Sequence, residues 1–130
     1  MIPGSKALRR ELEIELEGQA EFEAPLARLT SLRVGGPADV LVRPANRADL
    51  VRVFELATRF EVPICVLGGG FNTLVRDEGI RGIVVHLGAL RKVHRDGHGH
   101  VTAEAGATHS TVTRFCEEHG LSGLEFAVGI

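Results

Sequence analysis

Three helices are predicted from apolar residues that recur every three or four positions. Leucines four residues apart predict an opening helix over residues 5–17. The clearest pattern predicts a second helix over residues 47–60, with Asn46 as its N-cap. A third helix is predicted over residues 108–119, where Thr108 is suited to cap the first turn.

Short apolar runs rich in β-branched residues predict strands over residues 39–43, 64–67 and 83–87. Residues 91–95 and 100–104 flank Asp-Gly-His-Gly at residues 96–99, a typical hairpin turn. The polar residues 19–30 are interpreted as a connector, and residues 77–82 as a turn. The order strand, helix, strand, glycine loop, strand indicates a β/α unit with some parallel pairing.

Composition and charge argue against a nucleic-acid-binding, membrane-spanning or secreted protein. The net charge of −2 and the pI of about 6.3 give no support for a general nucleic-acid surface. No apolar segment is long enough to cross a bilayer, and the charged residues 1–17 do not form a secretory signal. Cys65 and Cys116 lie far apart and are interpreted as reduced packing residues, which predicts a cytoplasmic protein.

Three consecutive glycines, Gly68, Gly69 and Gly70, follow the apolar run of residues 64–67. Bare backbone of this kind either cradles phosphate oxygens or forms a tight connection in a crowded fold, and the glycines alone leave both interpretations open. No Gly-Lys-Ser/Thr follows, so the loop is not a Walker A site. A Rossmann fingerprint would require a third glycine where Thr73 stands. Asn72 and Thr73 could add polar contacts or serve as turn residues.

The remaining polar residues suggest no catalytic or metal site. His94, His98 and His100 cluster around the predicted hairpin, but no cysteine or carboxylate set completes a metal site. His86 lies in an apolar strand and is interpreted as a hydrogen-bonded core or edge residue. No Ser-His-Asp arrangement can be assembled from the spacing, so no catalytic residue is assigned.

Four motifs occur in one order along the chain. They are Thr-Ser-Leu-Arg-Val-Gly-Gly-Pro-Ala-Asp at residues 30–39, the glycine loop at 67–72, Leu-Ser-Gly-Leu-Glu-Phe at 121–126 and Gly-Ile at 129–130. Together they resemble the N-terminal part of the UDP-N-acetylenolpyruvoylglucosamine reductase (MurB) family. These flavoenzymes serve bacterial peptidoglycan synthesis, and through it cell wall biogenesis, cell shape and cell division. The resemblance runs from about residue 8 to residue 130.

This resemblance implies an α+β fold, the FAD-binding domain of the vanillyl-alcohol-oxidase/PCMH type. Residues 1–25 would form an N-terminal helix and connector that precede the domain. The domain itself, residues 26–130, would have a first lobe over about 26–88 and a second lobe that starts near 89 and is truncated. The substrate domain of the family would be absent.

The resemblance also implies which residues contact FAD. The pyrophosphate would lie against Leu67, Gly68, Gly69, Gly70, Phe71, Asn72 and Thr73, and the flavin would lie near Gly129 and Ile130. The family usually has a small hydroxyl residue, most often Ser, where Phe71 stands. Since Phe cannot donate a hydrogen bond to phosphate, one contact would be lost or replaced, and the ring could pack on the flavin or at a lobe boundary.

In the family's reaction NADPH reduces FAD, hydride passes to the enolpyruvyl group of a UDP-sugar, and a serine protonates the adjacent carbon. The residues that perform these later steps would lie beyond Ile130, so the isolated chain is expected to have no reductase activity. Its expected partner is FAD, with no nucleic acid or membrane, and the UDP-sugar would bind only through the missing domain. Two alternatives remain open: a non-catalytic nucleotide-binding or interaction module built on the same half-domain, and a truncated product without a stable role.

Overall fold

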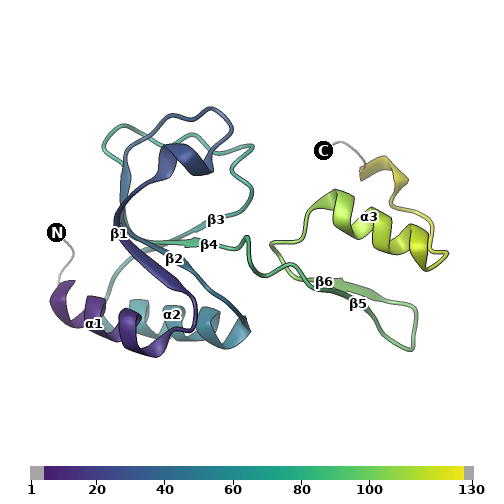
Figure 1. Ribbon diagram of the computed structural model, residues 1–130, viewed down its shortest axis with the longest axis horizontal. Helices are drawn as coiled ribbons and strands as arrows, with labels where there is room; N and C mark the ends of the chain where they lie inside the picture. The colour runs from purple at the N-terminus through teal and green to yellow at the C-terminus, as the bar shows by residue number, and fades with distance from the viewer. Residues whose placement is uncertain (1–4, 128–130) are drawn as a thin grey trace.

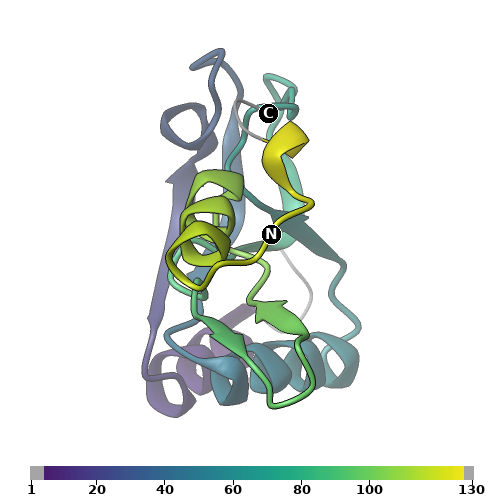
Figure 2. The ribbon, with the colours of Figure 1, turned by 90° about the vertical axis from the view of Figure 1, so that its right-hand side faces the viewer.

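The computed structural model describes residues 5–127 of the chain, and its elements form two groups (Figure 1). The elements are α1 (Ser5–Glu15), β1 (Gln19–Pro25), the 3-10 helix η1 (Leu26–Leu29), β2 (Pro37–Arg43), α2 (Arg47–Arg59), β3 (Ile64–Leu67), β4 (Ile80–His86), β5 (Val93–Arg95), β6 (Val101–Ala103), α3 (His109–Glu118) and the 3-10 helix η2 (Glu125–Ala127). We term the elements from α1 to β4 the sheet lobe, and those from β5 to η2 the hairpin lobe. Figure 2 views the chain from the side of the hairpin lobe.

The sheet lobe is built on a four-stranded sheet with the order β1-β2-β4-β3. β1 runs antiparallel to β2, whereas β2, β4 and β3 are mutually parallel, which confirms the predicted parallel pairing. The middle of β2 and the middle of β4 are completely buried at Val40, Leu41, Val42, Ile83, Val84 and Val85. The sequences of these strands contain continuous apolar runs because both faces of the sheet are covered.

A separate apolar core lies on each face of the sheet. α1 and α2 cover one face together, below the sheet in Figure 1, and bury Leu8, Leu12, Val53 and Leu56 against it. The opposite face is covered by η1 and by the loops before β2 and after β3, with a core of Leu26, Leu41, Leu67, Val75 and Val84. The loop after β3 is therefore packed onto the sheet on one side and open on the other.

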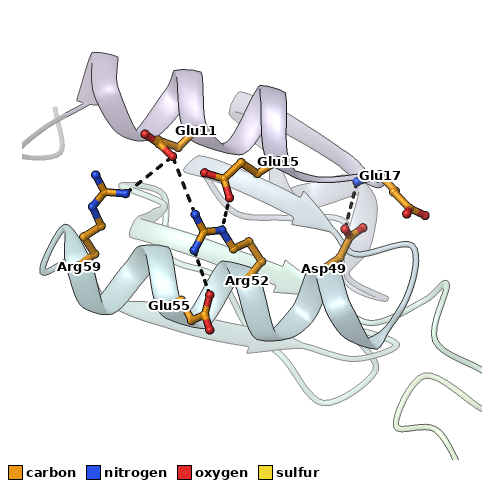
Figure 3. Close-up of polar contacts among 7 residues, drawn as sticks. All are labelled: Glu11, Glu15, Glu17, Asp49, Arg52, Glu55 and Arg59. Atoms are coloured by element: carbon orange, nitrogen blue, oxygen red, sulfur yellow. Dashed lines mark hydrogen bonds and ion pairs between the residues drawn. The ribbon is translucent and has the colours of Figure 1, made fainter.

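Polar contacts connect α2 to the N-terminal helix (Figure 3). Arg52 forms ion pairs with Glu11 and Glu15 of α1. The buried carboxylate of Asp49 accepts a hydrogen bond of 3.0 Å from the backbone N–H of Glu17. These contacts hold α1 in place beside α2.

Three local predictions are wrong or need adjustment. Residues 19–30 are not a connector, because β1 pairs with β2 along its length and η1 follows. The strand was missed because four of its seven residues are alanine or glutamate, and both are depleted in strands. The predicted turn at residues 77–82 is shorter, since β4 already begins at Ile80. α1 ends at Glu15 rather than at residue 17.

The predicted N-caps of α2 and α3 and the predicted hairpin are confirmed. The side chain of Asn46 accepts a hydrogen bond from the N–H of Asp49 at 2.9 Å, which starts α2. Thr108 Oγ1 accepts from the N–H of Thr111 at 3.1 Å, which starts α3. β5 and β6 form the predicted antiparallel hairpin.

Candidate cofactor-binding site

A cleft of about 380 Å³ lies between the two lobes, and we term it the interlobe cleft. The sheet lobe contributes Gly68, Gly69, Phe71 and His86 to its lining, and Gly88 and Arg91 line it from the link to β5. The other wall is made by residues 105–109 and Thr111, at the N-terminal end of α3. A volume of this size is typical of sites for small molecules.

The glycine loop is fixed on its inner side and open on its outer side. A Cβ atom added to Gly70, whose φ is +72°, would lie 1.9 Å from the carbonyl oxygen of Leu29. The carbonyl of Gly70 also accepts a hydrogen bond of 3.1 Å from the N–H of Ser31. A Cβ at Gly68, by contrast, would meet no atom within 4 Å. The backbone at Gly68 can therefore be approached closely by a ligand.

The N–H groups of this loop have no acceptor within the described part of the chain. No hydrogen bond among residues 5–127 uses the backbone N–H of Gly68, Gly69 or Gly70. Backbone donors without an internal partner that border a cleft are suited to bind an anion. Gly68 and Gly69 are exposed and line the interlobe cleft, whereas Gly70 is buried and does not line it, so the loop fits a phosphate group at Gly68 and Gly69.

The opposite wall is held against the end of the sheet by backbone contacts. The N–H of Gly106 donates to the carbonyl of Leu90 at 2.7 Å, and the N–H of Leu87 donates to Leu67 at 3.1 Å. A Cβ at Gly106 would lie 1.9 Å from the carbonyl oxygen of Leu87, so only glycine permits this approach. The contacts bring the N-terminus of α3, with its partial positive charge, to the same cleft as the glycine loop.

The ionisable groups that line the cleft favour an anion. They are the guanidinium of Arg91 and the imidazoles of His86 and His109, and none of the lining residues carries a carboxylate. Burial lowers the pKa of His86, and the nearby guanidinium of Arg43 lowers this pKa further. A second hollow of about 320 Å³, beside α3, is lined by Glu117 and Glu125 and would repel a phosphate.

Phe71 lies on the glycine loop with its side chain in the open. The residue is 78% exposed and lines the interlobe cleft. Its ring lies against Gly69, because a Cβ added there would be 2.8 Å from the ring atom Cε2. The Ser31 hydroxyl donates to the carbonyl of Phe71 at 3.2 Å. The backbone of Phe71 is thus anchored, while the ring covers part of the loop.

The other sequence-predicted site residues lie in different places. Leu67 is buried at the end of β3, where its carbonyl joins the sheet to Leu87. Asn72 is exposed and Thr73 half-buried, and neither lines the interlobe cleft. Gly129 and Ile130 lie outside the described residues.

The cleft residues on the hairpin-lobe side could not be recognised from the motifs of the sequence. Thr108 is predicted only as a helix cap, and the stretch from Ala105 to Ala107 matches none of the motifs. A detectable signal was present: Glu-Ala-Gly-Ala-Thr leads from a strand into a helix, just where backbone donors gather. Gly88 was missed because it follows a strand without any accompanying motif.

Two histidines of the hairpin turn, His98 and His100, form hydrogen bonds with Asp96. Asp96 accepts from the N–H groups of His98 and His100 at 2.9 Å each, and the ring Nδ1 of His100 lies 2.9 Å from the Asp96 carboxylate. Across residues 5–127 there is no group of three or more side chains arranged to hold a metal ion. In the same range no helix has both the length and the apolar character needed to span a membrane.

Together these features make a cleft whose backbone donors and charge are suited to an anion such as phosphate. Open glycine backbone lies on one wall and a helix N-terminus on the other, with basic side chains between them. The FAD-binding domain family matches residues 38–130. The chain belongs to this FAD-binding domain family, and its cofactor is FAD. The diphosphate of FAD is the group that the cleft chemistry fits.

Most of the chain is similar to UDP-N-acetylenolpyruvoylglucosamine reductases, which confirms the resemblance found in the sequence. It is 41% identical over 122 residues to that of Geotalea uraniireducens, covering 94% of this chain and 41% of the relative. It is 47% identical over 112 residues to that of Rubrobacter xylanophilus, covering 85% of this chain and 37% of the relative. The chain therefore spans about two fifths of the length of these relatives.

Solved structures show a related fold at low sequence identity. p-Cresol methylhydroxylase with substrate bound matches 92% of this chain and 22% of its own, with a TM-score of 0.54 and 14% sequence identity. Physcomitrella patens BBE-like 1 matches 70% of this chain and 21% of its own, with a TM-score of 0.50 and 17% sequence identity. These structures and the family match confirm the predicted fold class, an α+β FAD-binding domain of the PCMH type.

Proposed function

We propose that this chain is the FAD-holding part of a flavoenzyme that reduces UDP-N-acetylglucosamine enolpyruvate to UDP-N-acetylmuramate with NADPH. The observation that carries the proposal is the identity of 41% over 94% of the chain to a UDP-N-acetylenolpyruvoylglucosamine reductase. The open glycine loop in the interlobe cleft supports it independently, because it offers backbone donors to a diphosphate.

Within this proposal the chain binds and orients the cofactor. Gly68 and Gly69 would donate backbone hydrogen bonds to the diphosphate, and Phe71 would pack beside it, while Gly70, buried against Leu29, remains a proposed contact. Leu67 supports the loop from within the sheet, and Asn72, Thr73, Gly129 and Ile130 remain proposed cofactor contacts. FAD, when bound, supplies the hydride transfer, and the protein supplies the position of the cofactor and the exclusion of water.

Under this proposal, FAD and the UDP-sugar bind to different parts of the parent protein. A first lobe of about residues 26–88 and a second lobe from about residue 89 would hold FAD, and residues 1–25 precede them in sequence, with α1 and β1 packed on the first lobe. The UDP-sugar site and the proton-donating serine would belong to the part of the relatives that this chain does not span. Cytoplasmic peptidoglycan synthesis would be the setting, and it agrees with the two free cysteines, Cys65 and Cys116.

Flavin binding by the purified chain tests the proposal. Residues 1–130 are mixed with FAD, and binding is followed by flavin fluorescence and visible absorbance, with riboflavin as a ligand that lacks the diphosphate. We expect FAD to bind and riboflavin to bind at least tenfold more weakly. A folded chain, shown by circular dichroism, that binds no FAD would contradict the proposal and favour an interaction module.

Activity provides a second test. Purified residues 1–130, loaded with FAD, are assayed with NADPH and the enolpyruvyl UDP-sugar. We expect no turnover, because the substrate site is proposed to lie outside this chain. Measurable product from this chain alone would show that the substrate site does not lie outside it.

A further inference from the structure

His86 combines a position in the interlobe cleft with an imidazole that has no hydrogen-bond partner in the described part of the chain. The residue ends β4 and lines the cleft together with Gly68 and Gly69. The hydrogen bonds among residues 5–127 include ring nitrogens of His100 and His119 but neither ring nitrogen of His86. The expectation of a hydrogen-bonded core or edge histidine is therefore not met within these residues.

Gly88 makes room for the His86 ring. A Cβ atom added to Gly88 would lie 2.5 Å from His86 Cε1 and 3.1 Å from Nδ1. The distance of 2.5 Å is too short for a real Cβ atom, so any side chain at position 88 would displace the ring. The ring therefore lies directly against bare backbone at the cleft, where a ligand can reach it.

The charged groups around His86 come from several elements. Arg43 follows Val42, whose partner in the parallel sheet is Val85, the residue before His86, and the Arg43 guanidinium is itself 3.4 Å from the carboxylate of Glu21. Arg91 and His109 line the cleft from the link to β5 and from α3. Burial lowers the pKa of His86, and Arg43 lowers it further, which favours the neutral form of the free imidazole. A bound dianion would reverse this preference because it favours the imidazolium.

We propose that His86 is a further FAD-contacting residue, whose imidazole takes up a proton from solvent as it donates a hydrogen bond to the diphosphate. This inference rests on the proposed function, since it takes FAD as the ligand of the cleft. The phosphate charges of FAD do not change between pH 6 and pH 8, so any proton taken up on binding belongs to the protein. FAD affinity therefore increases as the pH falls through the pKa of His86 in the complex.

The experiment measures the dissociation constant for FAD at pH 6 and pH 8 in three proteins: the parent chain, His86→Gln and His98→Gln. Glutamine keeps a polar side chain without a proton that titrates in this range. His98 is the matched control because it is an exposed histidine of the hairpin turn that does not line the cleft. We expect about fourfold tighter binding at pH 6 than at pH 8 for the parent and for His98→Gln, because a pKa that starts below its usual value and increases by about one unit on binding changes the proton uptake only partly within this range. We expect a ratio near one for His86→Gln.

A second measurement keeps the inference testable if His86→Gln does not fold. The imidazole Cε1–H resonances of the parent are titrated by NMR with and without saturating FAD. The titration midpoint of His86 should rise with FAD, whereas that of His98 should stay unchanged. An unchanged midpoint for His86, or the same pH dependence of affinity in His86→Gln as in the parent, would overturn the inference alone. Failure of the parent to bind FAD at either pH would overturn the proposed function, and this inference with it.

Discussion

The backbone N–H of Ser31 donates to the carbonyl of Gly70 at a distance of 3.1 Å. This hydrogen bond joins the segment before β2 to the glycine loop after β3, and the Ser31 hydroxyl adds a second bond to Phe71. Two of the motifs that the sequence presents far apart are therefore one structural unit. The first segment supports the inner side of the loop, which leaves the outer side free for a ligand.

This two-sided loop predicts different effects for two glycine-to-alanine changes. Gly70→Ala should reduce the free energy of unfolding by about 1–3 kcal/mol, because alanine is strained at positive φ and its Cβ would overlap the Leu29 carbonyl. Gly68→Ala should leave unfolding nearly unchanged, since its Cβ meets no protein atom. It should still weaken FAD binding at least tenfold, because the methyl group blocks the approach of phosphate to the backbone. Urea unfolding and FAD titration of both variants measure these effects.

Gly97→Ala is the control for both variants, because Gly97 lies in the hairpin turn with open space around it. It should change neither unfolding nor FAD affinity. Full FAD affinity in Gly68→Ala would show that phosphate does not approach this part of the loop.

Phe71→Ser should bind FAD at least as tightly as the parent chain. The serine hydroxyl can donate to phosphate, and loss of a ring that is 78% exposed removes little buried surface. Removal of the ring also uncovers Gly69, against which it lies. Isothermal titration of FAD measures the affinity, and Phe71→Ala separates the gain of a hydroxyl from the loss of the ring. Markedly weaker binding by Phe71→Ser would mean that the loop is assigned to the wrong part of the ligand.

The helices and central strands could be predicted because local signals agree with their tertiary setting. Asn46 caps α2 in the sequence and in the structure, and the β-branched run of β4 lies where both faces of the sheet are covered. β1 could not be predicted in this way, because its pairing with β2 depends on a partner distant in sequence. At such an edge strand, tertiary pairing outweighs local propensity.

The candidate site was only half predictable for a similar reason. The glycine loop has its own sequence signature, whereas His86 and Gly88 join the site only because the link after β4 brings the start of α3 to it. Spacing along the chain carries no information about that contact. Thr108 is the clearest example. The sequence identifies it as a helix cap, which it is, but gives no sign that it also lines the cleft.

Asp49→Ala should destabilise the sheet lobe by roughly 2 kcal/mol. The Asp49 carboxylate is buried and accepts hydrogen bonds from the N–H groups of Glu17, Gly18 and Ala45, at 3.0, 2.8 and 2.9 Å. Alanine would leave these backbone donors without their acceptor at the point where α1 is tied to α2 (Figure 3). Urea unfolding measures the loss, and Asp77→Ala, at an exposed carboxylate, should show none. A loss of similar size in Asp77→Ala would point to overall charge rather than to these hydrogen bonds.

The ion pair between Glu15 and Arg52 should make stability depend on pH in the acid range. The hydrogen bond from Arg52 lowers the pKa of Glu15 from 4.5 to about 2 in the folded chain. A carboxylate with a lowered folded-state pKa stabilises the fold above its unfolded pKa, and this contribution is lost as the pH falls from about 4.5 towards 2. Glu15→Gln should therefore unfold more easily than the parent at pH 6, and the difference should shrink through that range. Thermal unfolding at pH 6, 4 and 2.5 measures this difference in stability, with Glu78→Gln as an exposed control.

Salt provides a second test of this ion pair. Because the side chains of Glu15 and Arg52 both reach solvent, salt at 1 M should reduce the difference between Glu15→Gln and the parent at pH 6. A difference insensitive to both salt and pH would show that packing, not charge, is responsible.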